Sequence, residues 1–507
     1  MNKAEKIARI ATLATVSFLM AIGLYMALAQ LRPFWIDEWR LIYNLKFKSA
    51  PALWEPLSLT QQFPRVYLEL LKAFTSSFDY SYTSLRLPAL IIATVSVFLC
   101  FSLLKSLLPP GKPTRFLFVM ILVSSFTFTD YIVQAKQYEM DILLSLTAIW
   151  QLLQLLQISS IGIQSKSRYL LLCISFAIVP FFSYTYPIAA APIFIIVLAK
   201  VALLYKRKNK EKAPELVPTS SGGVGVLPLL ISMVSIIIFY RIDVSQLMAD
   251  KQMIGYWQYK MMNNPFNLLS LSEKCWWLFA EVGAGFVFEI LFGIVGIASF
   301  FYGLYTAFKN LFQKQLADND LLLLYCAILL ALVIALIIAG KLPVEPKFNA
   351  FTVPAISILI ITLLNKLLQT TSTRKFATGA VAILYAGVII NIYTTCYALF
   401  FDANYARRMN IYRNTEKAIQ LAQAEKLPII INPGVAFPDQ ITKVYPFLTN
   451  ITADEVLKTF PSYKVNDSIP VYAINDLADV KEFMAQLPPD ITTVLAGDGQ
   501  EYRVIKR

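Results

Sequence analysis

The chain has 507 residues, of which 57% are hydrophobic and only 15% are charged. About a quarter of the residues of an ordinary soluble protein are charged, so this composition excludes that class. The formal charge of +13 would fit a nucleic-acid partner, but the basic residues gather in alternate breaks between apolar segments. That alternation is the positive-inside pattern of a membrane protein, and it argues against nucleic-acid binding.

Apolar segments of about 20 residues, the length that spans a bilayer, recur along the first four-fifths of the chain. They predict a polytopic α-helical membrane protein with about eleven transmembrane helices. We interpret the first segment as a retained span, because no small-residue cleavage site follows it. With a cytoplasmic N-terminus, the odd-numbered gaps face outward. The predicted spans are residues 10–31, 85–104, 116–133, 140–157, 169–184, 187–205, 223–240, 285–306, 321–339, 350–367 and 377–400.

The first outer gap, residues 32–84, contains the segment PRVYLELLKAF at 64–74. Its Tyr67, Leu70, Leu71 and Phe74 fall on one helical face, which predicts an amphipathic helix in the membrane interface. A helix packed on the outer loops fits the same pattern equally well. Residues 269–286 are a second candidate for an interfacial helix.

The composition changes after residue 401, where the apolar runs shorten to the length of strands. Strands are expected at 428–432, 470–474, 492–497 and 502–506, with helices at 414–426 and 475–486. This alternation predicts a small C-terminal α/β domain. The expected organisation is therefore a transmembrane domain at 1–401 and an extracytoplasmic domain at 402–507.

Two adjacent acids, Asp37 and Glu38, follow the first span in the segment LRPFWIDEWRL at 31–41. A charged pair in an interfacial loop is often merely solvated. Here Trp35 and Trp39 flank the acids, and acids partly withdrawn from water are typical of functional sites. The chain has no histidine, so acid–base chemistry falls to carboxylates, lysine or tyrosine.

The short third outer gap places Lys136, Tyr138, Glu139 and Asp141 within about one and a half helical turns. Asp141 opens a predicted span, where an acid is costly and marks a functional site. Lys136 has two interpretations. It is either a helix-end lysine that extends toward water, or a cation that binds a phosphate.

Three more cations lie on the outer side, against the positive-inside tendency: Arg65 in the first gap, Arg86 at the start of the second span, and Lys347 in the ninth gap. Several cations on one face indicate an anionic ligand at the outer leaflet. The five cysteines show no spacing typical of a metal site or a disulfide framework. Oxygen atoms of Asp37, Glu38 and Asp141 could bind a divalent cation, but the sequence does not require one.

Four segments together resemble a known family: FWIDEW at 34–39, the segment at 63–91 with RLPALI at its end, QAKQYEMDILL at 134–144 and KFNAFTVPAI at 347–356. They are similar to segments of the C-type membrane glycosyltransferases (GT-C) of the protein-mannosyltransferase-like group, to which the bacterial aminoarabinose transferases belong. The resemblance covers roughly residues 1–400, and the tail lies outside it.

This resemblance implies transfer of a sugar from a polyprenyl-phosphate donor, with inversion, to an envelope lipid, glycan or protein. It implies a multi-pass protein of the bacterial inner membrane. It also implies Asp37 as the base, with Glu38 as the alternative. Lys136 and Lys347 stand where the family usually has arginines, and a lysine holds a phosphate as a point charge, without the bidentate fork of arginine.

Three other functions remain as alternatives. The main one is a transporter or flippase of a lipid-linked saccharide, and the others are a polysaccharide polymerase or ligase and a sensory membrane protein with an outer binding domain. No internal inverted repeat is apparent, and the charges gather in the outer gaps and not midway through the spans. Both observations favour the enzyme over the transporter.

Overall fold

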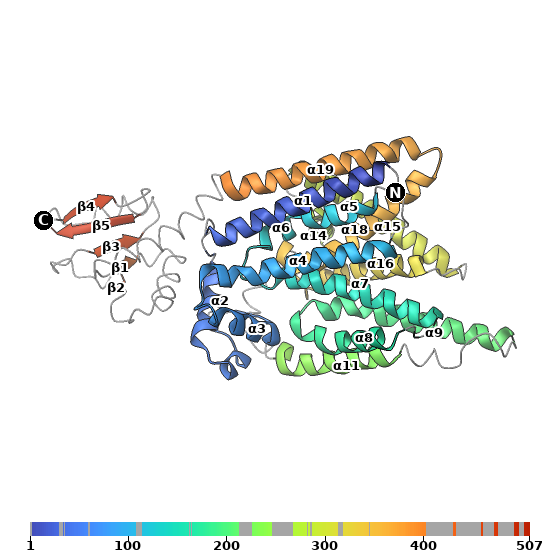
Figure 1. Cartoon of the computed structure of the whole chain (residues 1–507), viewed down its shortest axis with the longest axis horizontal. Helices are drawn as coiled ribbons and strands as arrows, with labels where there is room; N and C mark the ends of the chain where they lie inside the picture. The colour runs from blue at the N-terminus through green and yellow to red at the C-terminus, as the bar shows by residue number, and fades with distance from the viewer. Residues whose placement is uncertain are drawn as a thin grey trace. The chain divides into compact units, whose positions relative to one another are not determined.

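The computed structural model is mostly helical (Figure 1). Beyond the helical region, the structure describes five strands in the C-terminal part of the chain. The described residues are 3–29, 34, 36–58, 61–107, 114–161, 163, 165–211, 226–245, 267–280, 282–283, 286–312, 318–343, 345–401, 429–431, 458–459, 471–474, 491–495 and 501–506.

Helices lie at all the predicted apolar segments. Eight helical segments among the described residues are long and apolar enough to cross a membrane, so the chain is an integral membrane protein. The count of eleven stays a prediction. The helices at the predicted spans are α1 (Lys3–Leu28), α4 (Tyr82–Leu107), α5 (Thr114–Ser124) with α6 (Phe126–Tyr131), α7 (Tyr138–Ile161), α8 (Lys166–Ile178), α9 (Tyr186–Glu211), α11 (Val226–Phe239), α15 (Phe286–Phe312), α16 (Asp318–Ile338), α18 (Val353–Gln369) and α19 (Arg374–Phe401).

Two of the predicted spans are shorter helices for local reasons. The third is divided at Ser125, whose hydroxyl accepts a hydrogen bond from the backbone N–H of Phe128 and so caps a new helix, α6. The fifth is the 13-residue helix α8, which continues as the 3₁₀ segment η2 (Val179–Phe182). Pro180 lies in this segment, where a proline cannot continue the α-helical hydrogen bonding.

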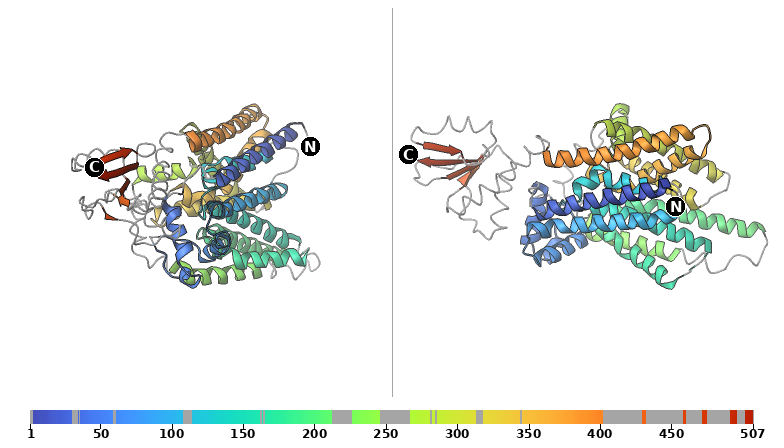
Figure 2. Two further views of the ribbon diagram at one scale, coloured as in Figure 1. Left: turned by 60° about the vertical axis from the view of Figure 1, so that its left-hand side comes forward. Right: turned by 45° about the horizontal axis from the view of Figure 1, so that its top comes forward.

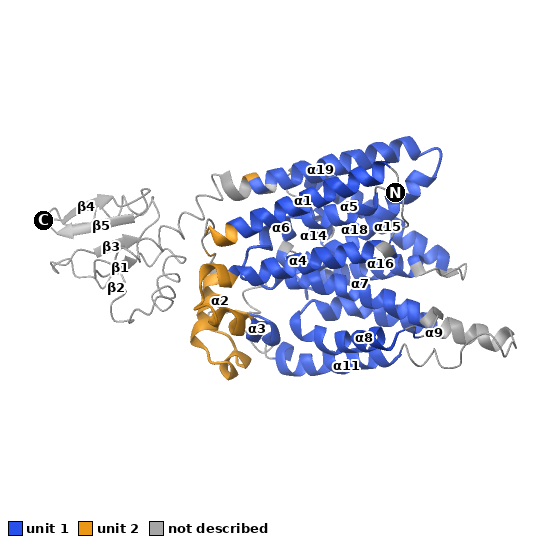
Figure 3. Cartoon of the chain, viewed as in Figure 1, with its two compact units in different colours: residues 1–25, 62–70, 86–396 blue, residues 26–61, 71–85, 397–507 orange. Residues whose placement is uncertain are grey.

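Two compact units divide the chain, and they are coloured separately in Figure 3. Unit 1 comprises residues 1–25, 62–70 and 86–396, and unit 2 comprises residues 26–61, 71–85 and 397–507. The predicted domain boundary between residues 401 and 402 stays a prediction.

Long helices that run alongside one another form the body of unit 1 (Figure 2). Helix α15 packs on α14 (Leu268–Ala280), α16 and α18, and helix α7 packs on α9. Close approach requires glycine at Gly293 of α15, where a Cβ atom would lie 2.7 Å from the ring of Trp276. Buried polar side chains also link helices, as when Nδ2 of Asn391 donates to the carbonyl of Ser124 at 2.6 Å.

A helix is present at the predicted amphipathic segment, namely α3 (Arg65–Ser76). Tyr67, Leu68 and Leu71 are buried on its inner face. Leu70, predicted on the same apolar face, is 56% exposed, so only part of that face is buried. Helix α14 overlaps the second predicted segment at 269–286, and the interfacial position of both helices stays a prediction.

Two helical elements of unit 2 lie within the first outer gap. They are α2 (Ile36–Phe47) and the 3₁₀ segment η1 (Pro51–Trp54). The side-chain amide of Asn44 joins α2 to the segment that follows η1, because it accepts from the backbone N–H of Ser58 at 2.8 Å and donates to the Ser58 carbonyl at 3.0 Å.

A five-stranded sheet forms the described part of the tail, in the order β2-β1-β3-β5-β4. Strand β1 pairs in parallel with β2 and β3, and β5 pairs antiparallel with β3 and β4. Four strands coincide with predicted ones, whereas β2 was not predicted. The predicted helices at 414–426 and 475–486 lie outside the described residues, so the α/β domain stays a prediction. The strands are β1 (Ile429–Ile431), β2 (Lys458–Thr459), β3 (Val471–Ile474), β4 (Ile491–Leu495) and β5 (Glu501–Lys506).

The predicted topology has a direct test. A cysteine placed at Gln440 in a cysteine-free background is expected to react with a membrane-impermeant maleimide in intact spheroplasts, because an odd number of spans puts the tail outside. A cysteine at Asn209, in the most basic gap, serves as the inner control and is expected to react only after permeabilisation. If residue 440 also needs permeabilisation, the number of spans is even.

Candidate active site

Asp141 is a buried acid in the first turn of α7. The hydroxyls of Ser183 and Thr185 both donate to its Oδ1 atom, the second at 3.0 Å. These two residues precede α9, and Oγ of Ser183 also accepts from the backbone N–H groups of Thr185 at 3.0 Å and Tyr186 at 3.2 Å. These backbone N–H groups at the start of α9 therefore polarise the Ser183 hydroxyl, which strengthens its hydrogen bond to Asp141.

Glu139, two residues earlier, is fully buried in a different way. No described residue provides a hydrogen bond to either of its carboxyl oxygens. A buried polar group without a partner is costly to stability. The arrangement therefore leaves both carboxyl oxygens available for hydrogen bonds to polar groups of a ligand.

Tyr67 of α3 lies near both acids. Burial, and then the charges of Asp141 and Glu139, raise the pKa of Tyr67. Its phenol therefore stays protonated and acts as a donor, in this case to the backbone carbonyl of Lys136 at 3.4 Å. The sequence pattern placed Tyr67 on a helix face but did not predict this contact.

The cation Lys136 lies in the tight turn before α7. Its side chain is buried, and its Nζ atom lies 5.0 Å from the centre of the Phe63 ring. A lysine that extends toward water would leave its ammonium group exposed, so the burial favours the phosphate interpretation. Arg86 is also buried and donates through Nη1 to the carbonyl of Val133, so it supports the backbone of this turn.

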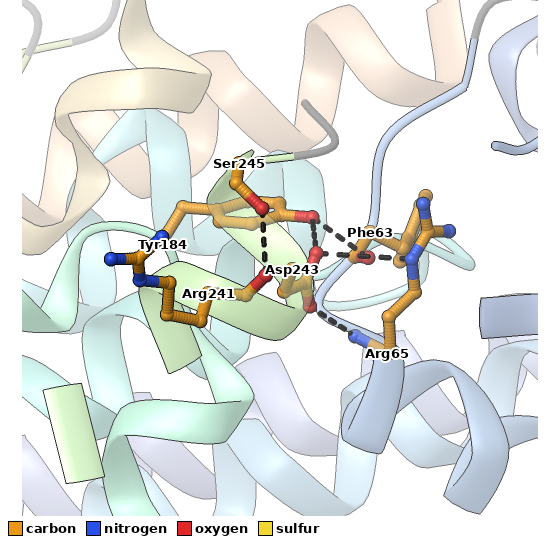
Figure 4. A network of polar contacts seen from close by, with 6 residues as sticks. All are labelled: Phe63, Arg65, Tyr184, Arg241, Asp243 and Ser245. Atoms are coloured by element: carbon orange, nitrogen blue, oxygen red, sulfur yellow. Dashed lines mark hydrogen bonds and ion pairs between the residues drawn. The ribbon is translucent and has the colours of Figure 1, made fainter. Parts of the chain in front are cut away.

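Arg65 is the third buried cation, and it belongs to a polar network with Asp243 and Tyr184 (Figure 4). Its backbone N–H donates to Oδ2 of Asp243 at 2.8 Å, and its Nε lies 3.8 Å from Oδ1. The phenol of Tyr184 donates to Oδ1 of Asp243 at 2.6 Å and lies 2.9 Å from the carbonyl of Phe63. Both neighbours of this phenol are acceptor oxygens, so Tyr184 acts as a donor in the network.

Sequence reasoning missed Asp243 and Tyr184. The signal for Asp243 was present, because it ends an apolar span as Asp141 begins one. Tyr184 carried no such signal, since it is the last residue of the predicted span 169–184 and has no charged residue near it in the sequence. Its role depends on contacts with residues more than fifty positions away in both directions.

Two predicted ligand-binding residues have protein partners. Tyr138 is buried, and its ring packs on the ring of Tyr131 with centroids 4.5 Å apart. Lys347, in the short helix α17 (Pro346–Asn349), has its Nζ 3.2 Å from Oε2 of Glu345. A phosphate would compete with this carboxylate, so Lys347 is a weaker candidate than Lys136.

The predicted pair Asp37 and Glu38 lies in unit 2. These acids lie in a helix and not in an irregular loop, because both belong to the first turn of α2, where an acid interacts favourably with the helix dipole. Asp37 is partly exposed and pairs with Nη1 of Arg40 at 3.6 Å, whereas Glu38 is fully buried. Trp39 is buried against Phe34, while Trp35 lies outside the described residues. The convergence of these acids with Asp141 stays a prediction.

A metal site has no support in the part of the chain that the structure describes, where no group of three or more acidic, cysteine or histidine side chains is placed to hold an ion. The divalent cation considered from the sequence stays a prediction.

The two acids of α7 should respond differently to substitution. Asp141→Leu is expected to lower the free energy of unfolding by about 1–3 kcal/mol, because two buried hydroxyls lose their acceptor. Glu139→Met should leave stability unchanged or raise it, since no described partner is lost. Thermal unfolding of both purified variants in the same detergent measures the difference. Equal destabilisation would show that Glu139 has a structural partner.

Comparison with known proteins identifies the fold. No protein-family model matches the sequence, and neither does any curated protein. Among solved structures, the chain is similar to ArnT from Cupriavidus metallidurans bound to undecaprenyl phosphate, with a TM-score of 0.51 and 11% identity over 97% of this chain and 98% of that chain. The apo state of that protein gives 0.49 and 11%, over 98% and 97%.

The archaeal oligosaccharyltransferase AglB from Archaeoglobus fulgidus, in complex with an inhibitory peptide and a dolichol-phosphate, gives a TM-score of 0.47 and 10% identity over 97% of this chain and 74% of that chain. The similarity to the undecaprenyl-phosphate-bound ArnT extends over nearly the whole of both chains. The resemblance predicted from the sequence is therefore confirmed at the level of the fold.

Proposed function

We propose that this protein is a membrane glycosyltransferase that moves a sugar from a polyprenyl-phosphate donor to an acceptor outside the cytoplasm, with inversion at the anomeric carbon. One observation carries the proposal. The buried acids Asp141 and Glu139 lie on the same helix turn, next to the buried cation Lys136. This group belongs to a chain with the fold of ArnT, a protein whose solved structure binds undecaprenyl phosphate.

The chemistry needs a base and a stabilised leaving group. An acceptor hydroxyl attacks the anomeric carbon while the bond to the phosphate breaks, through an oxocarbenium-like transition state. One carboxylate takes the hydroxyl proton, and cations stabilise the departing phosphate. Asp37 suits the role of base, because it is the partly exposed member of its pair and an acceptor can reach it. Glu38 is the alternative base.

The other residues divide into two groups. Lys136 and Arg65 bind the phosphate of the donor, with Arg86 and Lys347 in secondary positions. Glu139 and Tyr138 contact hydroxyl groups of the sugar, and Asp141 orients the acceptor. The protein lies in a bacterial inner membrane with its N-terminus in the cytoplasm. Its partners are the lipid donor, surrounding membrane lipids, and an envelope lipid, glycan or protein as acceptor.

Mass spectrometry of envelope lipids, glycans and glycoproteins, with and without the gene, tests this function. Loss of the gene should remove one sugar from one acceptor class and leave the lipid-linked donor in excess. Wild-type protein should restore the modification, and the Asp37→Asn variant should not. Restoration by both Asp37→Asn and Glu38→Gln at normal protein levels would favour the alternative, a flippase that delivers a lipid-linked saccharide to another enzyme.

A further inference from the structure

The network around Arg65 extends the proposed function. We propose that Asp243 and Tyr184 are positioning residues, which hold Arg65 so that its unused N–H groups bind an anionic ligand group. The ligand class is a phosphate. Its identification as the phosphate of the lipid donor rests on the proposed function, whereas the positioning itself does not.

The hydrogen bonds of Asp243 show how the positioning works. Its short bonds run to the backbone N–H of Arg65 at 2.8 Å and to the phenol of Tyr184 at 2.6 Å (Figure 4). The Nε atom of the Arg65 side chain lies 3.8 Å away, which is too long for a hydrogen bond but close enough to offset its charge. Asp243 thus balances the charge of Arg65, while the Nε and Nη1 donors have no acceptor among the described residues.

Those unused donors point to a ligand. Arg65 is 5% exposed, and no described residue accepts a hydrogen bond from its Nε or Nη1 atom. A guanidinium presents its donors in a planar fork that matches phosphate oxygens. Native proteins rarely leave such groups buried and unsatisfied, and a phosphate supplies the acceptors that the described residues do not.

The location of Asp243 argues against a purely structural pair. It is 2% exposed and lies in the π-helical segment η3 (Tyr240–Val244), which ends α11. The helix dipole disfavours a negative charge at the C-terminal end of a helix. A buried ion pair is, in addition, weak evidence that the pair stabilises the fold. Single π-helical turns, moreover, are common at functional sites.

One tripeptide connects this network to the acid of α7. Ser183 and Thr185 donate to Asp141, and Tyr184 between them donates to Asp243. This tripeptide therefore holds two groups of opposite charge in place. One is Asp141, the acid proposed to orient the acceptor. The other is Arg65, the cation proposed to bind the phosphate, which Tyr184 reaches through Asp243. A change in the backbone of this tripeptide would move both groups together.

A double-mutant cycle on phosphate affinity tests the inference, with the full-length protein in nanodiscs and undecaprenyl phosphate as the probe. Arg65→Met should weaken binding about ten- to hundredfold, the scale of a charge-assisted hydrogen bond. Tyr184→Phe and Asp243→Asn should each weaken it severalfold in the wild-type background. Neither should weaken it further in the Arg65→Met background, because both act through Arg65. Ser245→Ala is the matched control, since that hydroxyl donates only to the carbonyl of Arg241 within the network and should not change affinity.

Three results would overturn the inference: unchanged affinity in Arg65→Met, unchanged affinity in both Tyr184→Phe and Asp243→Asn, or additive effects in the double variants. If Asp243→Asn does not fold, Tyr184→Phe completes the cycle, because it removes one hydroxyl and leaves the ion pair.

Inorganic phosphate is a second probe, and its binding is measured as protection of the protein against thermal unfolding. If the protein binds inorganic phosphate through Arg65 but does not bind undecaprenyl phosphate, the positioning of Arg65 by Asp243 and Tyr184 stands and the proposed lipid donor is wrong. Binding of neither probe would reject the positioning.

Discussion

The Asp37→Asn variant is expected to transfer sugar about 10²–10⁴-fold more slowly than the wild type, the usual cost of losing a general base. Asparagine keeps the shape of the side chain but cannot take the proton of the acceptor hydroxyl. Folding and donor binding should survive, because Asp37 is partly exposed and its ion pair with Arg40 lies within one helix turn. Initial rates at matched protein levels, with one lipid-linked donor, measure the effect.

Glu38→Gln is the matched control for this experiment. Neighbouring residues of a helix point about 100° apart, so Asp37 and Glu38 of α2 cannot serve one site equally. Because Glu38 is fully buried, its variant should affect transfer less than Asp37→Asn and stability more. Full activity of Asp37→Asn together with an inactive Glu38→Gln would assign the base to Glu38. Full activity of both variants would leave the proposed mechanism without a base.

Lys136→Met is expected to weaken donor binding by about 1.5–3 kcal/mol, or roughly ten- to 150-fold, since a charge-assisted contact to the phosphate is lost. Methionine retains the apolar stem that packs near the ring of Phe63, so the loss should fall on the charge and not on packing. Binding of a labelled polyprenyl phosphate to purified protein measures the change.

Lys347→Met provides the comparison, because the ammonium of Lys347 already lies 3.2 Å from a carboxylate oxygen of Glu345. Its effect on donor affinity should be several times smaller than that of Lys136→Met. If both variants bind the donor as the wild type does, neither lysine contacts the phosphate. Lys136 would then be a buried structural cation on the face of an aromatic ring.

Hydropathy predicted the helical fold well, because each apolar segment must satisfy its own backbone groups within a membrane. It failed where a local cap competes with helix continuation. At Ser125 the surrounding residues are apolar, so the segment looked continuous, yet one hydroxyl begins a new helix there. The first turn of α2 was missed because the acids were interpreted as part of an interfacial loop, although Asp37 and Glu38 are a typical signal for a helix start.

The candidate site was only partly predictable. Lys136, Glu139 and Asp141 lie close in sequence, and an acid at the start of a span is a strong signal by itself. The partners of these residues come from other helices. The hydroxyls that hold Asp141 lie more than forty residues away, and the carboxylate that pairs with Arg65 lies 178 residues away. No periodicity in a single sequence encodes such contacts, because they depend on how the helices pack.

The most direct test is a single-turnover reaction with purified protein in sealed vesicles, a polyprenyl-phosphate sugar in the membrane, and extracted envelope acceptors outside. Mass spectrometry would follow the lipid and the acceptor together. The account predicts free polyprenyl phosphate in amounts equal to the sugar gained by the acceptor. The transferred sugar should have the anomeric configuration opposite to that in the donor. The Asp37→Asn variant should form little product. Movement of the intact lipid-linked sugar across the bilayer, without release of polyprenyl phosphate, would contradict it.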